Sequence, residues 1–387
     1  MKYPRVLALI LAGGKGSRLG ALTERRAKPA LPFAGTYHLI DIPLSNLLHS
    51  GLPHVWVVQQ YLPNSLNDHL ANGRPWDLDR THGGLRVLPP YQGAEGEGFA
   101  EGNADALYRQ RKLIREFAPD LVLVLSADHL YTLDYRDVLE RHLAGDAALT
   151  MVTTKVNKRE ASRFGVVETD GERVTGFAYK PEEPATDTVT AEVFLYTTEA
   201  LLGTLEALAE EGETLSDYGD SLIPRLVERE TVLAHPLPGY WRDVGTVQSY
   251  WEGHMDLLAG KGLDFDDPAW PILSDSPQRL PARIERGAEL DSSLVSPGAR
   301  VAGRVVRSVV GEGAVVEAGA SVVDSVLLEG VQVGPEASLT RTVADLGARF
   351  GKGAQVGGEG ELTVVGMNAR VRGGRKVEAG AEVPPTD

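Results

Sequence analysis

The carboxyl-terminal part of the chain carries a repeat of aliphatic side chains that few folds can accommodate. Its members are Val310, Val316, Val322, Leu328, Val333 and Leu339. The first four follow one another at six-residue intervals, and the last two resume the interval after a slip of one residue. An antiparallel sheet has a side-chain period of two and would not keep this spacing. A β-helix with three short sides per turn keeps it, because one aliphatic side chain points inward on each side. Residues 287–387 are therefore predicted to form a left-handed hexapeptide-repeat β-helix.

The preceding part of the chain alternates apolar runs with segments of helical character. Val6–Leu11, Val55–Gln59 and Leu121–Leu125 are runs of the kind found in strands buried on both faces. Strands that alternate with helices predict an α/β fold with a doubly wound, mostly parallel, Rossmann-like sheet. We place this domain at residues 1–259, followed by a linker at residues 260–286, where Pro, Asp and Ser are dense.

Two helices and one loop matter for the later argument. Helices are expected at 102–116, opened by a cap at Asn103 or Asp105, and at 216–227. Residues 76–102 are rich in Gly and Pro and are predicted to form a long active-site loop.

A glycine-rich loop follows the first strand. Gly13, Gly14 and Gly16 let the backbone turn sharply and present adjacent N–H groups, which can form an anion-binding concavity. Lys15 and Arg18 add positive charge to the same loop. The loop matches neither the Walker sequence nor the dinucleotide pattern. On its own it therefore indicates either a nucleotide phosphate site or an ordinary tight turn.

The charge balance limits the partners of this chain. A formal net charge of −15 argues against nucleic acid, because a phosphate backbone requires a basic surface. An enzyme for anionic substrates can be acidic overall when its cations gather at the site. Arg25, Arg26 and Lys28 follow the loop at short range and are expected to extend its cationic cluster. No apolar run is long enough to span a bilayer and cysteine is absent, so we expect no membrane association and a cytoplasmic location.

Two acidic residues and one lysine lie near expected strand ends. Asp128 follows the central strand, and Asp243 lies in the segment 241–246. Nucleotide-bound magnesium takes one or two protein carboxylates, so this pair could hold Mg²⁺, although each aspartate alone could equally stabilise a turn. Lys180 precedes Pro181, where it is either a phosphate-binding cation or a solvated surface lysine.

Taken together, these motifs resemble those of a known enzyme family. The segments 11–19 (LAGGKGSRL) and 27–35 (AKPALPFAG) are similar to the signature of the sugar-phosphate nucleotidyltransferases. The resemblance implies that Arg18 and Lys28 hold a triphosphate and that Asp128 and Asp243 bind Mg²⁺, so these four are the expected catalytic residues. The segment that contains Lys180 resembles the family's Glu-Lys-Pro motif, whose lysine binds the phosphate of the sugar 1-phosphate.

Within this family, the chain most resembles the glucose-1-phosphate adenylyltransferases. The segments that carry the resemblance are 27–30 (AKPA), 40–46 (IDIPLSN), 60–61 (QY), 102–106 (GNADA), 127–131 (ADHLY), 164–166 (FGV) and 240–246 (YWRDVGT). The implied substrates are ATP and glucose 1-phosphate, and the implied product is ADP-glucose for glycogen or related α-glucan synthesis. The resemblance also implies a homotetramer that assembles through the β-helix and possible effectors among phosphorylated metabolites.

The same resemblance implies two sets of ligand contacts. The nucleotide-binding residues would be Leu11, Ala12, Gly13, Gly14, Gly16, Gln60, Gly102 and Asn103. The residues that bind the sugar phosphate would be Ala100, Gly165, Tyr179, Lys180, Thr190 and Glu192.

Several of these positions depart from the family pattern. The glutamate of Glu-Lys-Pro is Tyr179, a tyrosine is replaced by Ala100, and a threonine beside the adenine is replaced by Asn103. The family's Ser-Met-Gly segment is Thr190-Ala191-Glu192, which keeps a hydroxyl and gains a carboxylate. Glu192 could replace the lost hydrogen bonds to glucose, or the sugar could differ.

Other functions remain open at this point. The chain could use another sugar 1-phosphate or nucleotide, act as a catalytically silent regulatory subunit, or be an acyltransferase. All four expected catalytic residues are present, which argues against a silent subunit, and no histidine follows His254, which argues against an acyltransferase. In some relatives a lysine just before the Ile-Asp segment receives the effector's phosphate. Residues 35–41 contain no lysine or arginine, so weak or altered activation is expected.

Overall fold

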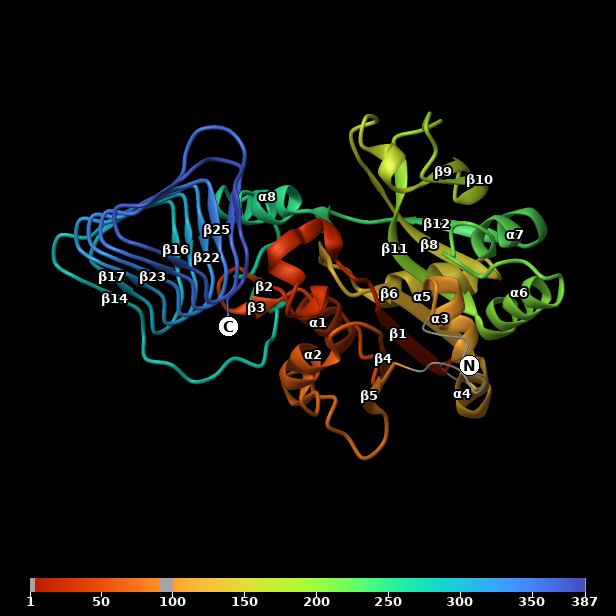
Figure 1. The fold of residues 1–387 in the computed structure, drawn as a ribbon. Coiled ribbons are helices and arrows are strands. Elements are labelled where there is room, and N and C mark those ends of the chain that lie inside the picture. The colour runs from red at the N-terminus through yellow and green to blue at the C-terminus, as the bar shows by residue number, and fades with distance from the viewer. Residues whose placement is uncertain (1–3, 91–99, 387) are drawn as a thin grey trace. The chain divides into compact units, whose positions relative to one another are not determined.

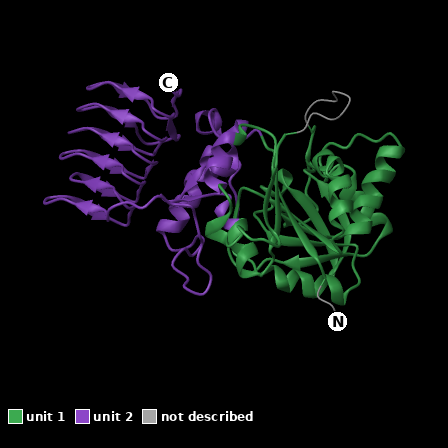
Figure 2. Cartoon of the chain, turned by 90° about the horizontal axis from the view of Figure 1, so that it is seen from below, with its two compact units in different colours: residues 1–14, 43–63, 71–241 green, residues 15–42, 64–70, 242–387 purple. Residues whose placement is uncertain are grey.

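The computed structural model describes residues 4–90 and 100–386, which divide into two compact units (Figure 2). Unit 1 comprises residues 1–14, 43–63 and 71–241. Unit 2 comprises residues 15–42, 64–70 and 242–387, so the segment after the glycine loop groups with the carboxyl-terminal part of the chain. Part of the predicted loop 76–102 lies outside the described residues.

Unit 1 is built on a nine-stranded sheet with the order β5-β4-β1-β6-β11-β8-β12-β10-β9 (Figure 1). Its strands are β1 (Val6–Ala12), β4 (His54–Gln59), β5 (Gly84–Leu88), β6 (Leu121–Ser126), β8 (Leu149–Lys155), β9 (Gly165–Asp170), β10 (Arg173–Tyr179), β11 (Thr188–Thr197) and β12 (Val232–Pro236). β5, β4, β1 and β6 are parallel, and β8 pairs in parallel with β12. β10 and β11 run opposite to the other strands. The predicted α/β fold with a mostly parallel sheet is confirmed, and the two antiparallel strands lie in its β-rich half.

Helices cover this sheet and close the core. The helices of the chain are α1 (Asp41–His49), α2 (Pro63–Leu70), α3 (Asn103–Arg109), α4 (Arg111–Phe117), α5 (Tyr135–Ala144), α6 (Thr198–Glu210), α7 (Leu222–Arg229) and α8 (Val247–Leu258). Leu107 of α3, Leu205 of α6 and Leu226 of α7 share one buried cluster with Leu9 and Val124 of the sheet. α5 packs against β8, β11 and β12. Among the described residues, none of the helices has the length and apolarity needed to cross a bilayer.

Two of the predicted helices differ from the structure. The helix expected at 102–116 is divided at Gln110 into α3 and α4, and Gly102 is its N-cap without a side-chain cap hydrogen bond. Asp105 lies inside the first turn and accepts hydrogen bonds from the Glu101 N–H and the Arg109 side chain, so the expected cap was wrong. The helix expected at 216–227 begins only at Leu222, because residues 216–217 are irregular and residues 218–221 form turns.

Unit 2 contains the left-handed β-helix, whose short parallel strands stack into three sheets of six strands each (Figure 1). One sheet holds β14 (Arg283–Ile284), β17 (Arg300–Val301), β20 (Val315–Val316), β23 (Gln332–Val333), β26 (Arg349–Phe350) and β29 (Arg370–Val371). The second holds β15 (Glu289–Asp291), β18 (Arg304–Val306), β21 (Ser321–Val323), β24 (Ser338–Thr340), β27 (Gln355–Gly357) and β30 (Lys376–Val377). The third holds β16 (Leu294–Val295), β19 (Val309–Val310), β22 (Val326–Leu327), β25 (Thr342–Ala344), β28 (Thr363–Val365) and β31 (Glu382–Val383).

The aliphatic repeat fills the β-helix core with one shift from the predicted series. Val310, Val316 and Val322 are fully buried and face the interior together with Val333 and Leu339. After Val322, the next core residue is Leu327 and not Leu328. Leu327 stacks between Val310 and Ala344 of the neighbouring turns. The one-residue slip therefore falls between Val322 and Leu327.

The other segments of unit 2 pack against this β-helix. The Arg26 guanidinium forms a buried ion pair with Asp345, with 2.5 Å between Nη2 and Oδ1. The Ala21 N–H donates to the Glu382 carboxylate at 2.5 Å, and the Trp251 indole N–H of α8 donates to the Asp324 carbonyl at 2.7 Å. Each of these bonds joins a segment next to the glycine loop, or α8, to a turn or strand of the β-helix.

Candidate active site

Three parallel strands of unit 1 end side by side at one edge of its sheet. Ala12 of β1 is in register with Gln59 of β4, and Leu11 of β1 is in register with Ser126 of β6. Ligands of open α/β sheets bind outside the carboxyl ends of such strands. Leu11 also packs against the sheet core, which fixes the start of the loop that contains Gly13 and Gly14.

Gln60 joins two of the predicted nucleotide-binding segments. Its side-chain amide donates to the Ala100 carbonyl at 2.6 Å. Its side-chain oxygen lies so close to Gly13 that a Cβ there would come within 3.1 Å. No described atom outside the neighbouring residues lies within 4 Å of the position of a Cβ on Gly14. The structure therefore brings Gly13, Gln60 and Ala100 together and leaves the backbone at Gly14 accessible.

The start of α3 is fixed by the segment 216–217. The Ala104 N–H donates to the Ser216 carbonyl at 3.1 Å, and any side chain at Gly102 would overlap the backbone of Ser216. Gly102 and Asn103 are thus held beside the turn that precedes α7. This close approach explains glycine at position 102, whose φ of −172° any residue could adopt.

Asp128 lies just beyond the end of β6, at the same edge. The Ser126 hydroxyl donates to its carboxylate, and His129 Nε2 lies 4.0 Å from the same oxygen, Oδ1. The His129 ring is held by Trp241, which it meets edge to face, and its Nδ1 lies 3.2 Å from the Ala191 carbonyl oxygen. Oxygen atoms of this kind are the ligands that Mg²⁺ prefers, so the donor chemistry at Asp128 fits the expected metal.

A chain of polar groups runs through the expected sugar-phosphate segment. The Lys180 ammonium donates to the Tyr179 hydroxyl at 2.6 Å, and this hydroxyl donates to Asp217 Oδ2 at 2.8 Å. Burial, reinforced by the Asp217 carboxylate, raises the pKa of Tyr179, so this hydroxyl stays protonated and remains a donor. The second oxygen of Asp217, Oδ1, is buried without a hydrogen-bond partner among the described residues. A side chain at Gly219 would overlap the Tyr179 ring, so this glycine makes room for it.

Glu192 lies on a bulge of β11. The register of β11 against β8 shifts between Thr190 and Phe194, and Glu192 has a φ of 55°, which is unusual for a residue with a side chain. Its carboxylate accepts a hydrogen bond from the Tyr218 hydroxyl at 2.6 Å. Burial, together with this carboxylate, raises the pKa of Tyr218 well above its usual value. The bulge therefore re-aims the carboxylate that the chain gains at position 192 toward the segment 217–219.

Thr190 of β11 lies beside Gly165, the first residue of β9. A Cβ at Gly165 would come within 2.7 Å of the Phe177 ring and 3.2 Å of the Thr190 hydroxyl oxygen. Thr190 itself is buried, with 3% of its surface exposed. Position 165 thus needs a glycine because two neighbouring strands approach it closely.

Unit 2 brings together three of the four expected catalytic residues. Lys28 Nζ lies 3.8 Å from Asp243 Oδ1. A Cβ at Gly245 would lie 2.8 Å from an Asp243 carboxylate oxygen and 3.1 Å from the Arg18 guanidinium, so both groups flank this glycine. Gly16 has a φ of 68° and packs against Lys28 and Thr23, where a Cβ would be strained as well as crowded. The grouping of two cations with one carboxylate is suited to a phosphate that carries a metal ion.

Two cations that were expected in this cluster lie elsewhere. Arg26 is 5% exposed and is committed to its ion pair with Asp345. Arg25 donates to the Thr386 carbonyl at 3.2 Å. Arg26 therefore binds the β-helix, and the expectation that it extends the phosphate-binding cluster was wrong, whereas Arg25 contacts the segment that follows the last strand of the β-helix. A sequence pattern cannot distinguish a cation that faces a ligand from one that faces a carboxylate more than three hundred residues away.

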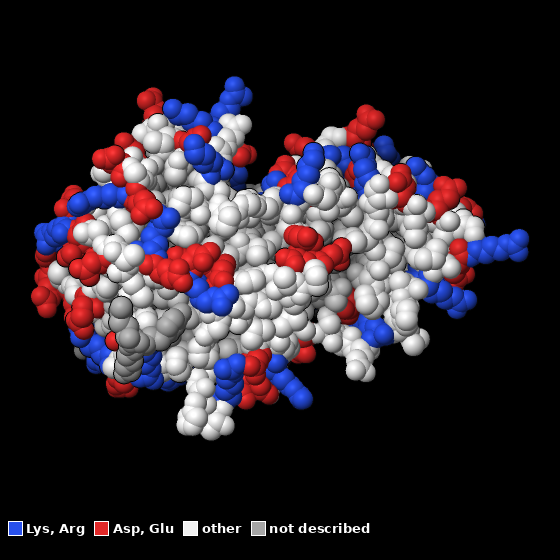
Figure 3. All heavy atoms as spheres, turned by 180° about the vertical axis from the view of Figure 1, so that it is seen from behind, with Lys and Arg blue, Asp and Glu red and all other residues white. Residues whose placement is uncertain are grey.

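The segment 217–219 is the part of the site that the sequence analysis missed. Asp217, Tyr218 and Gly219 were assigned to a helix, whereas the structure places them against Tyr179 and Glu192. The run Ser216-Asp217-Tyr218-Gly219-Asp220 contains the residue types that mark turns, and this signal could have found them. Figure 3 shows acidic and basic side chains intermixed over the face it presents, although acidic residues outnumber basic ones in the whole chain, 54 to 39.

Comparison with known proteins identifies the family. Residues 7–260 match the family described as Nucleotidyl transferase, and residues 279–369 match the one described as GlmU-like, C-terminal hexapeptide. A glucose-1-phosphate adenylyltransferase of Bacillus cytotoxicus is 37% identical over 350 residues, which cover 90% of this chain and 93% of that protein. The chain belongs to the glucose-1-phosphate adenylyltransferase family.

Other members are similarly related. The enzyme of that name from Bacillus thuringiensis is 39% identical over 88% of this chain and 91% of its own length. The one from Clostridium perfringens is 38% identical over 86% of this chain and 87% of its own. Both the nucleotidyl transferase part and the hexapeptide part therefore have counterparts across the family, which confirms the resemblance inferred from the motifs.

Proposed function

We propose that this chain transfers the adenylyl group of ATP to glucose 1-phosphate, giving ADP-glucose and pyrophosphate. The observation that carries the proposal is the grouping of Arg18, Lys28 and Asp243 around Gly245 in a chain of this family. Two cations beside a carboxylate fit a triphosphate with its metal ion, and they do not fit an uncharged substrate.

The reaction is a displacement at the α-phosphorus. A phosphate oxygen of glucose 1-phosphate forms a bond to this phosphorus while the bond to the oxygen that bridges to the β-phosphorus breaks, and pyrophosphate leaves. The chemistry requires no covalent bond to the protein, so its residues act by positioning and by neutralising charge. Arg18 and Lys28 offset charge on the triphosphate and on the departing pyrophosphate, while Lys180 binds the phosphate of the attacking sugar.

Mg²⁺ is proposed as the metal, with Asp128 and Asp243 as its ligands. The carboxylate donors fit its preference for oxygen, and bound magnesium would neutralise phosphate charge. Ser126 orients the Asp128 carboxylate through its hydroxyl, whereas Lys28 lies beside Asp243.

Glucose is proposed as the sugar despite the altered positions. The family's glutamate is lost at Tyr179, but two other carboxylates belong to the same hydrogen-bonded segment, Glu192 on its bulge and Asp217 with its unpartnered Oδ1. Either can accept a hydrogen bond from a sugar hydroxyl. The same substitutions favour, as a second candidate, a sugar 1-phosphate other than glucose 1-phosphate.

A substrate panel tests both assignments. ATP, UTP and dTTP are combined with the 1-phosphates of glucose, galactose, mannose and N-acetylglucosamine, and pyrophosphate release is measured with magnesium. We expect ATP with glucose 1-phosphate to give the highest kcat/KM. A tenfold preference for UTP or dTTP would overturn the adenylyl assignment, and a tenfold preference for another sugar would establish the second candidate. The variant Arg18→Gln should be inactive with every pair and excludes a contaminating enzyme.

A homotetramer is proposed as the assembly. Large apolar side chains are exposed on and just before the first turn of the β-helix, where no earlier turn covers them: Leu280, Ile284, Leu290 and Leu294. Large apolar side chains left exposed in this way mark association sites. Light scattering on the double variant Leu290→Glu/Leu294→Glu should give smaller species than the parent chain. An unchanged molar mass would exclude this end of the β-helix as a subunit contact.

Weak activation by phosphorylated metabolites is proposed as well. The segment 35–41 offers His38 where the resemblance implies a lysine in some relatives, and burial holds the pKa of this histidine well below its usual value. It is therefore neutral near pH 7 and attracts a phosphate poorly. Initial rates at low ATP with millimolar fructose 1,6-bisphosphate should rise less than about tenfold, or ~1.4 kcal/mol of coupling; a larger rise would contradict the proposal. A cytoplasmic location also remains a proposal.

A further inference from the structure

One flat face of the β-helix carries a column of side chains. Arginines at one end of this column are paired with glutamates, whereas those at the other end are not, among the residues that the structure describes. The first residues of its six strands lie in register, one above another: Arg283, Arg300, Val315, Gln332, Arg349 and Arg370. The next residue of each strand points into the core. Four of the six outward positions therefore hold a guanidinium group, in a chain whose net charge is −15.

The arginines at the start of the column are neutralised. Arg300 forms ion pairs with Glu285 at 3.3 Å and with Glu317 at 2.5 Å, and Arg283 lies 3.7 Å from Glu285. Glu285 and Glu317 each lie two residues after the column. At this end, the β-helix supplies its own anions.

The arginines at the far end have no such partners. Arg349, Arg370 and Arg372 are exposed, and none of their guanidinium groups has a hydrogen bond or ion pair with another described residue. Gly334 and Gly351 occupy the positions that correspond to Glu317, because the backbone bonds from 317 to 333, from 334 to 350 and from 351 to 371 keep one register. Arg372 follows at the same position of the next turn, so the sequence replaces acid by glycine and then by a third cation.

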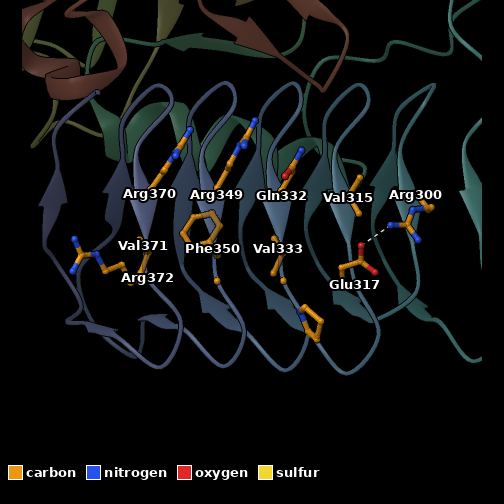
Figure 4. Close-up of a pocket in the computed structure, with 13 residues that line it drawn as sticks. Arg300, Val315, Glu317, Gln332, Val333, Arg349, Phe350, Arg370, Val371 and Arg372 are labelled. Atoms are coloured by element: carbon orange, nitrogen blue, oxygen red, sulfur yellow. Dashed lines mark hydrogen bonds and ion pairs between the residues drawn. The ribbon is translucent and has the colours of Figure 1, made fainter. Parts of the chain in front are cut away.

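These residues line a shallow cavity of about 570 Å³. Figure 4 shows the side chains of Arg349 and Arg370 extended in the same direction from neighbouring strands, with Gln332 next in the row and the ion pair between Arg300 and Glu317 at the other end. A Cβ at Gly334 would come within 2.7 Å of the Phe350 carbonyl oxygen, and one at Gly351 within 2.5 Å of the Gly373 nitrogen. Side chains are thus excluded from the space beside the arginines, and the hollow stays open.

We propose that Arg349 and Arg370, whose side chains extend together, form a binding site for a polyphosphate-type anion on the β-helix, with Arg372 as a further cation at its margin. Neighbouring strands are about 4.8 Å apart, so two like charges face each other without compensation unless a ligand bridges them. Guanidinium forks match phosphate oxygens in geometry, and a chain of linked phosphates can reach more than one fork at once. A single phosphate would satisfy only part of the set. This site is separate from the proposed reaction and does not depend on it.

The test compares tripolyphosphate binding to the full-length wild type with binding to Arg349→Gln/Arg370→Gln, by calorimetry at low ionic strength. The double variant should lose one bound tripolyphosphate per chain, or bind it at least tenfold more weakly, while turnover with ATP and glucose 1-phosphate stays unchanged. Arg300→Gln is the matched control, because it removes an arginine of the same column that the protein already neutralises, and it should stay within twofold of wild type. Identical isotherms for wild type and the double variant would overturn the proposal.

Further measurements identify the ligand and test whether the double variant loses binding only because it is misfolded. Inorganic phosphate should bind the site at least tenfold more weakly than tripolyphosphate, and equal binding would overturn the bridging argument. ATP that binds the site as tightly as tripolyphosphate would assign it to nucleoside polyphosphates, whereas ATP that fails to bind would assign it to inorganic chains. Tripolyphosphate should raise the Tm of wild type more than that of the double variant; an equal rise would contradict the site.

Discussion

The sheet of unit 1 and the β-helix of unit 2 differ in how much their residues vary from strand to strand. In the sheet, three neighbouring strands lead into different groups: β1 is followed by glycines, β4 ends at Gln59 before Gln60, and β6 ends at Ser126 before Asp128. In the β-helix, equivalent positions repeat from turn to turn, and the inward ones are almost all Val, Ala or Leu. Inward positions that repeat serve packing, and positions that do not repeat are available for chemistry.

This contrast separates two kinds of substitution. A change at an inward position of the β-helix should alter stability and leave turnover intact, whereas a change at the sheet edge should alter turnover and leave stability intact. Four experiments test how far that separation holds.

The largest effect is expected for Phe350→Ala in the β-helix. Phe350 is 3% exposed and stacks between Val333 and Val371, so its removal leaves a cavity and should cost about 3–5 kcal/mol of local stability. Hydrogen exchange should accelerate in residues 326–377 and stay unchanged in β6, with normal kcat. Gln355→Ala, at an exposed position of β27, is the control that should change neither. Faster exchange in β6 would show that the two regions do not unfold separately.

Asp128→Asn should have the next largest effect, now on turnover. It removes the charge of a proposed metal ligand where phosphoryl charge develops, so kcat should fall by about 10²–10³ with an unchanged Tm. Asp137→Asn makes the same change at an exposed position of α5 and should leave kcat near normal. A normal turnover number for Asp128→Asn would remove this residue from the reaction.

Lys180→Gln should give a smaller and more selective effect. A charged hydrogen bond to one phosphate contributes about 1.5–3 kcal/mol, so the KM for glucose 1-phosphate should rise by roughly 10–100-fold and the KM for ATP much less. Lys155→Gln removes an exposed lysine of β8 and is the matched control. Equal rises in both KM values would mean that Lys180 acts through the Tyr179 and Asp217 chain as a structural residue.

The smallest effect concerns pH and unit 2. His254 is fully buried, its Nε2 accepts the Ala34 N–H at 3.1 Å, and burial lowers its pKa to about 4. The unfolded chain binds a proton near pH 6.5 and the folded chain does not, so this group stabilises the fold above pH 6.5 and loses that contribution as the pH falls toward 4. The loss between pH 7.5 and 5.5 should be about 1 kcal/mol.

Urea unfolding at the two pH values measures this loss. His254→Gln should reduce the pH dependence, whereas His82→Gln, at an exposed position, should not. An unchanged pH dependence in His254→Gln would assign the effect to other groups.

The sequence predicted the β-helix well because its information is local. From Val310 to Leu339 each inward residue follows the last by five or six positions, and only the position of the five-residue side was misplaced, at Leu328 in place of Leu327. Either leucine suits a buried position. Only the pairing with Val310 and Ala344 distinguishes them, and that pairing is a contact between turns.

The site was predicted less evenly. Gly13, Gln60 and Lys28 could be proposed as site residues because they belong to contiguous motifs at strand ends or in tight turns. The turn that holds Asp217 is marked in the sequence. The roles of Asp217 and Arg26 could not be assigned, because they depend on Tyr179 and Asp345, which lie far away in the sequence. Helical spacing also suggested a helix through Gly219, where the Tyr179 ring requires a turn.

The buried pair of Arg26 and Asp345 limits how such a protein can be recombined. Asp345 is fully buried, and a buried guanidinium without its carboxylate is strongly destabilising. Arg26 lies two residues before Lys28. If the β-helix were replaced by one without this carboxylate, the Arg26 charge would be buried without its ion-pair partner, close to a proposed catalytic lysine. The β-helix therefore cannot be exchanged on its own, and a chimera would need an aspartate at position 345 together with the arginine at position 26.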